Sequence, residues 1–117
     1  MTQVEALEQQ LGANKFAVEM RDMAIKLSEN REFRKLILEG FCEKECARYA
    51  RESGDPSLTA EQRQDALNMA QAAGHLKRFL SVIFVTGNTA QNQISEIEFA
   101  LEEIRTGANE NSEEGDE

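Results

Sequence analysis

Two cysteines four residues apart, in the segment FCEKEC at residues 41–46, have a spacing that could support metal chemistry. On a helix, thiols at i and i+4 share one face and can chelate an ion, and the single histidine, His75, is a further candidate ligand. In an antiparallel hairpin about Pro56, His75 would lie about 7 Å along the helix axis from Cys42 and about 13 Å from Cys46. A tetrahedral zinc ion, with bonds of about 2.0–2.3 Å, is poorly placed to bind all three. We therefore predict neither a metal site nor a cofactor.

Redox or nucleophilic chemistry is equally poorly supported by these residues. Cα atoms at i and i+4 of a straight helix are about 6 Å apart, with side chains badly directed for a disulfide. Neither thiol lies at a predicted helix N-terminus, where the helix dipole would lower its pKa. The sequence also lacks phosphate-binding glycine loops, nucleophile elbows and HExxH or EF-hand patterns. We interpret Cys42 and Cys46 as packing residues and expect no catalytic site and no small-molecule substrate.

Composition indicates one globular domain. Of 117 residues, 40% are hydrophobic and 30% are charged, with one proline and no tryptophan. The longest apolar run, residues 79–85, is far shorter than the roughly 20 residues of a membrane-spanning helix. The first residues have neither a basic segment nor an apolar segment of a secretory signal. The sequence thus predicts a cytoplasmic protein without membrane contact.

The net charge of −9 argues against direct binding to nucleic acid, which requires a basic surface. Residues 107–117 hold five acids and no base, so the rest of the chain is only mildly acidic. The densest group of bases is matched by an equal number of interleaved acids, as on a solvated helix with ion pairs. The bases are Arg31, Arg34, Lys35, Lys44, Arg48 and Arg51, and the acids are Glu29, Glu32, Glu39, Glu43, Glu45 and Glu52.

Apolar spacings of three and four residues predict helices along most of the chain. The first covers residues 2–27, weakened or bent at Gly12, and the second covers residues 31–52 after a boundary at Ser28–Asn30. Residues 53–59 form the clearest boundary, because Gly54 can adopt positive φ and Pro56 lacks an N–H. Thr59 and Gln62 have capping-box spacing, so a third helix should begin at Ala60.

Two heptad-like seams follow on the C-terminal half of the chain. The first includes residues 66, 69, 73, 76, 80 and 83; the second includes residues 90, 94, 97, 101 and 104. Thr86–Asn88 should separate two helices, with Asn88 and Gln91 as a second capping box. A buried strand at residues 79–85 is the alternative to helix there. Gly107 should end the last helix, leaving residues 107–117 as an acidic flexible tail.

These elements predict an all-α fold in which an antiparallel helical hairpin, at about residues 30–86, lies within a three- to four-helix bundle formed by residues 1–106. In that hairpin Gly40 falls opposite the small residues 72–74. We therefore predict that Gly40 and Gly74 mark a close approach of two helix backbones.

At 100° per residue, the helix at residues 31–52 has two apolar stripes. The broader one holds Phe33, Leu36, Ile37, Gly40, Phe41, Ala47 and Ala50. The narrower one holds Leu38, Cys42, Cys46 and Tyr49. A helix with two apolar faces touches two different neighbours, so the narrower stripe is the candidate protein interface. The predicted partner is a second copy of the chain or another protein.

Part of the chain resembles small acidic helical proteins encoded by tailed bacteriophages. The resemblance lies in residues 30–41, Glu45, Arg48, the Asp55–Pro56 turn and residues 77–80, and covers about half of the chain. Cys42 and Cys46 depart from that pattern. The resemblance implies a role in the virion or in head morphogenesis, as a scaffold, core or accessory component, with a location in the host cytoplasm and the virion. It implies no site residues.

We therefore predict a non-enzymatic helical assembly protein that acts through helix packing. The alternative is an acidic inhibitor that mimics nucleic acid and occupies a basic surface of a host protein; a regulatory adaptor of the bacterial cell is a third possibility. Added salt and loss of the tail should weaken mimicry strongly but leave assembly through apolar seams intact.

Overall fold

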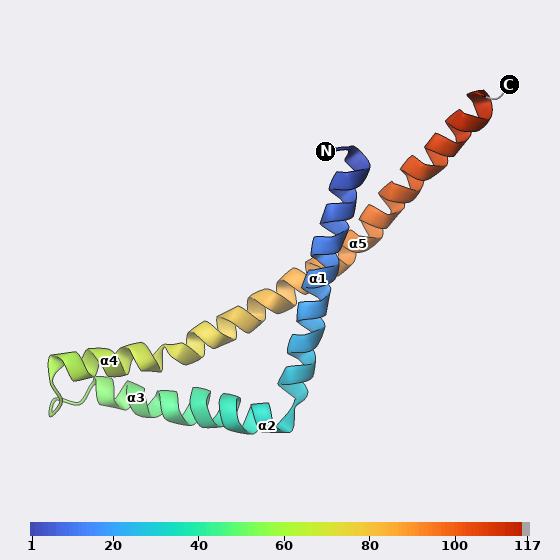
Figure 1. Cartoon of the computed structure of the whole chain (residues 1–117). Helices are drawn as coiled ribbons and strands as arrows, with labels where there is room; N and C mark the ends of the chain where they lie inside the picture. Colours follow the sequence, from blue (N-terminus) through green and yellow to red (C-terminus); the bar gives the residue numbers. More distant parts are fainter. Residues whose placement is uncertain (116–117) are drawn as a thin grey trace. The chain divides into compact units, whose positions relative to one another are not determined.

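The computed structural model describes the backbone of residues 1–115 and the side chains of residues 1–108 (Figure 1). Within the described backbone every regular element is a helix, which confirms the all-α prediction and excludes the strand at residues 79–85. The chain divides into two compact units. Unit 1 contains Met1–Asp22 and the chain from Ile83 onward, and unit 2 is Met23–Val82. The arrangement of these helices as a three- to four-helix bundle stays a prediction.

Unit 2 contains the predicted antiparallel hairpin. Its first arm is continuous from Arg31 to Ser53 and comprises α2 (Arg31–Phe33), η1 (Arg34–Glu45) and α3 (Cys46–Ser53). Its second arm starts with α4 (Ala60–Ala70), which lies beside α3 and runs in the opposite direction (Figure 1). The first arm begins where the sequence predicts, because the Asn30 side chain accepts a hydrogen bond of 2.8 Å from the Phe33 N–H.

The turn between the arms is held by local hydrogen bonds. Asp55 accepts from the N–H of Ser57 at 2.9 Å and from its hydroxyl at 2.7 Å, and these bonds lower the pKa of Asp55. The predicted capping box is confirmed: the Thr59 hydroxyl accepts from the Gln62 N–H, and the Gln62 side chain accepts from the Thr59 N–H. Gly54, however, has a φ of −102°, so the prediction of positive φ is wrong.

The middle of the first arm is a π-helix of 12 residues. Backbone bonds in a π-helix join residues five apart, as in the bond from the Cys46 N–H to the Phe41 carbonyl. Residues at i, i+4 and i+5 then share a face, whereas an α-helix brings together i, i+3 and i+4. The 100° spacing used on the sequence therefore does not apply to residues 34–45.

Unit 1 is formed by two helices, α1 (Gln3–Glu29) up to Asp22 and α5 (Ala72–Gly115) from Ile83 onward. Helix α1 passes through Gly12 without interruption. Helix α5 passes through Thr86–Asn88 and through Gly107, so both predicted helix ends are wrong. The structure instead interrupts the helix at Gln71, between α4 and α5. The predicted tail is helical as far as Gly115, residues 116–117 lie outside the described backbone, and flexibility of the tail stays a prediction.

Candidate protein interface

Cys42 and Cys46 lie inside unit 2, with exposed fractions of 8% and 4%. Both are free thiols, and the Cys46 thiol lies 3.6 Å from the Met69 carbonyl oxygen, at which its S–H points. Burial raises the pKa of the Cys42 thiol, and the neighbouring Cys46 raises it further, so Cys42 is a poor nucleophile at neutral pH. Their burial agrees with a packing role. No three potential metal ligands come together among the described side chains, and His75 is exposed.

The two apolar stripes predicted for residues 31–52 are not separate in the structure. Phe33, Ile37, Leu38 and Phe41 are all half-buried, together with the buried Cys42 and Cys46, whereas Leu36 is 71% exposed. The π-helix explains this merging, because its wider turn brings residues four and five apart to one face. Leu36, a member of the broader predicted stripe, is the most exposed large apolar side chain of this arm.

The four predicted interface residues are therefore largely covered by the chain itself. Besides the buried cysteines, Leu38 and Tyr49 are half-buried. The Arg48 guanidinium lies 4.5 Å from the centre of the Tyr49 ring, and it also forms ion pairs with Glu45 and Glu52. These pairs hold the guanidinium beside the ring, and the hydrogen bond from Arg48 lowers the pKa of Glu45.

The two glycines predicted to mark a close helix approach do not do so. A Cβ atom at Gly74 would have no neighbour within 4 Å, and one at Gly40 would meet only the Lys35 carbonyl oxygen of its own helix, at 3.2 Å. The close approach occurs in unit 1 instead. A Cβ atom at Gly87 would lie 2.3 Å from the Cβ of Arg21 on α1.

Arg21 joins α1 to α5 through a polar cluster that the sequence reasoning missed. One guanidinium nitrogen, Nη1, donates to the Asn88 side-chain oxygen at 2.9 Å and to that of Gln91. The other two nitrogens donate to Asp22, with a shortest distance of 2.9 Å, and the Arg21 side chain is only 12% exposed. Asn88 and Gln91 thus accept from a neighbouring helix and do not cap a helix of their own.

The α1 face that joins this cluster follows a heptad pattern. Val4, Leu7, Leu11, Asn14, Val18 and Arg21 fall at steps of three and four residues, and all are half-buried. On α5 the matching positions are Ile83, Gly87, Ala90, Ile94, Ile97, Leu101 and Ile104, which are buried or half-buried. Phe16 lies off this face and is 62% exposed. The packed face of α1 therefore runs through Val18 and Arg21 and not through Phe16.

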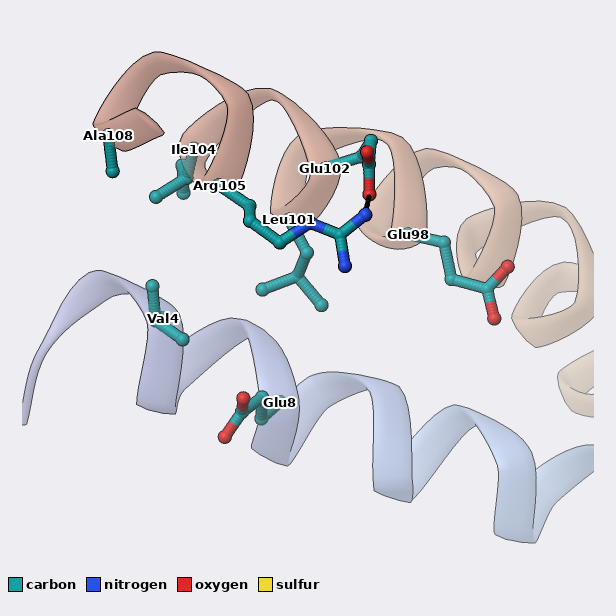
Figure 2. A pocket seen from close by; sticks show the side chains of 8 residues that line it. All are labelled: Val4, Glu8, Glu98, Leu101, Glu102, Ile104, Arg105 and Ala108. Atoms are coloured by element: carbon teal, nitrogen blue, oxygen red, sulfur yellow. Dashed lines mark hydrogen bonds and ion pairs between the residues drawn. The ribbon is translucent and has the colours of Figure 1, made fainter. Parts of the chain in front are cut away.

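A groove opens between the two helices near the start of α1 (Figure 2). It has a volume of about 580 Å³, and Figure 2 shows α1 and α5 running in opposite directions there. Val4 is directed toward α5, and Leu101 toward α1. The groove is lined by Val4, Leu101, Ile104 and Ala108 and by the charged residues Glu8, Glu98, Glu102 and Arg105. This apolar floor with a charged rim is suited to binding a protein segment.

Comparison of the chain with protein-family models, with curated proteins and with solved structures finds no significant match. Within the described residues, none of the helices combines the length and the apolar character needed to span a membrane.

Proposed function

We propose that this chain is a non-enzymatic helical assembly protein that associates with further copies of itself by helix packing. One observation carries the proposal: among the described side chains, twelve large apolar ones are exposed and only one is buried. Five of the six buried apolar residues are small: Ala24, Cys42, Cys46, Ala66 and Ala90, with Ile97 as the sixth. The exposed set is Met1, Phe16, Met23, Ile25, Leu27, Leu36, Leu67, Met69, Phe79, Val82, Val85 and Phe99.

Burial of these side chains would favour association. Covering one valine, leucine or phenylalanine side chain contributes about 1.5–3 kcal/mol. Phe79 and Val82 are three residues apart on α5, so they lie on one face of that helix, and they are 59% and 51% exposed. A second molecule that packed on this face would cover both side chains.

The test is the molar mass of the chain in solution, measured by light scattering over a concentration series. We expect masses above the 13.2 kDa of one chain, at both about 0.1 M and about 1 M salt, because apolar contacts are not weakened by screening. Replacing Phe79 and Val82 by serine should raise the dissociation constant at least tenfold. Ser81→Ala is the control, since Ser81 is exposed on another face of the same helix and its replacement should not alter the mass.

A mass of 13.2 kDa at every concentration would reject self-association. Self-association that disappeared in about 1 M salt would show that charge, and not apolar packing, holds the copies together. The resemblance to small phage proteins supports virion or head morphogenesis as the setting of this assembly. Presence of the chain in purified particles, measured by mass spectrometry, would test that setting.

A further inference from the structure

The groove at the start of α1 combines an apolar floor with unpaired negative charge. Val4, Leu101 and Ile104 are half-buried, so each keeps part of its apolar surface accessible in the groove. Their helices contribute from both sides: Val4 from α1, and Leu101 and Ile104 from successive turns of α5 (Figure 2). Such a floor accepts a few apolar side chains presented at helical spacing by a partner.

The rim carries three carboxylates and one guanidinium. Arg105 forms an ion pair with Glu102 on the preceding turn of α5, as the dashed line in Figure 2 marks. Among the described side chains, neither Glu8 nor Glu98 has an ion-pair partner. The rim therefore has a net charge of −2, and the sequence after Ala108 adds five acids and no base. This sign of charge selects a cationic partner.

We propose that the groove binds a cationic amphipathic helix of another protein, with leucine-like residues at i, i+3, i+4 and i+7 and lysine or arginine on the flanks. The inference rests on the proposed function, because it names the partner of a protein that acts by helix packing. Apolar residues of the partner would cover Val4, Leu101 and Ile104, while its bases would meet Glu8 and Glu98.

The negative charge of the rim argues against other classes of ligand for the groove. Nucleic acid and anionic lipid surfaces would be repelled by the glutamates of the rim. A second copy of this chain supplies no cationic helix, because its densest bases, at residues 31–51, are matched by interleaved acids. The oligomer proposed above must therefore form through other surfaces, which leaves the groove available for a different protein.

The experiment uses the full chain and three synthetic helical peptides, with binding measured by calorimetry at low salt. The first peptide has the leucine pattern flanked by lysines, the second has glutamate in place of lysine, and the third has serine in place of leucine. We expect the leucine–lysine peptide to bind. The glutamate and serine peptides should each bind at least tenfold more weakly, because each lacks one of the two complementary features.

Variants of the chain locate the binding site. The pair Glu8→Gln and Glu98→Gln should weaken binding of the leucine–lysine peptide about fivefold to tenfold, because two rim ion pairs are lost. The matched control is the pair Glu19→Gln and Glu103→Gln, which makes the same charge change at exposed sites of the same helices outside the groove. It should change the affinity less than twofold. Leu101→Ser should also weaken binding of the leucine–lysine peptide. If Leu101→Ser unfolds the chain, the glutamate variants still locate the site, because they change only exposed side chains.

Three results would overturn the proposal: no binding of the leucine–lysine peptide, equal binding of the glutamate or serine peptide, or equal weakening by the groove and control pairs. The experiments distinguish an error in the proposed peptide binding at the groove from an error in the proposed self-association. A monomeric chain that binds the peptide rejects the oligomer alone, whereas an oligomer that ignores the peptide rejects the groove alone.

Discussion

The close approach of α1 to α5 leaves no room for a side chain at Gly87. Gly87→Ala would place a Cβ atom 2.3 Å from the Cβ and 2.9 Å from the Cγ of Arg21, so the two helices must separate. Overpacking of this kind outweighs the gain in helix propensity, and we expect a net loss of about 1–2 kcal/mol in the free energy of unfolding. Urea unfolding monitored by circular dichroism measures this loss.

Gly12→Ala is the control for that substitution, because a Cβ at Gly12 would have no neighbour within 4 Å. It should raise the free energy of unfolding by about 0.5–1 kcal/mol through helix propensity alone. A gain of stability for Gly87→Ala as well would show that α1 does not pack against α5 at this position.

Single residues also show why the sequence located the tight contact at the wrong glycine. The hairpin placed Gly40 opposite the small residues 72–74, but which residues pack against a glycine cannot be read from its own neighbours in the sequence. The role of Arg21 could not be predicted from the sequence, because its hydrogen-bond partners Asn88 and Gln91 are 67 and 70 residues away. The burial of both cysteines follows more simply, since a small apolar residue on a half-buried face needs no particular partner.

At the scale of elements, the boundaries with a local physical cause were predicted correctly. Asn30 and Thr59 cap helices through hydrogen bonds to residues three positions away, so the sequence holds all the information needed. The predicted boundary at Thr86–Asn88 was wrong. Glycine and asparagine often end helices, but Gly87 and Asn88 here contact Arg21 of α1 and the helix continues through them. The heptad phase gives a better signal: Ile83, Gly87 and Ala90 continue one register without a break, which favours a single helix. No comparable pattern in the sequence indicated that residues 34–45 form a π-helix.

The pairing of α1 with α5 should depend on the Arg21 cluster. We expect a double-mutant cycle with Arg21→Met and Asn88→Ala to give a coupling energy of about 0.5–1 kcal/mol, because the hydrogen bond joins two helices and the guanidinium is mostly buried. Unfolding free energies of the four proteins measure it.

Gln64 and Asn68 provide the comparison for that cycle. Their side chains are hydrogen-bonded at 3.0 Å within α4 and are exposed, so their coupling should be only about 0.2–0.5 kcal/mol. A coupling between Arg21 and Asn88 that did not exceed this value would mean that the apolar heptad positions alone set the register of α1 on α5.

For the molecule as a whole, apolar surface favours association while charge opposes it. Each copy carries a net charge of −9, and residues 110–117 contribute five of the acids but no base. Like charges repel most strongly at low salt, where the screening length is long. The acidic segment therefore limits self-association, and it also adds to the field that would attract a cationic partner.

Deletion of residues 110–117 tests the first of these effects, the limit on self-association. The net charge falls to −4, so the dissociation constant of the oligomer should fall severalfold at about 0.01 M salt, and the difference should vanish at about 1 M salt, where the screening length is about 3 Å. A full-length chain with the five acids replaced by their amides should match the truncation, because charge and not chain length is responsible. Light scattering measures both proteins. Weaker association after truncation, with the amide variant unchanged, would instead show that residues 110–117 pack in the assembly.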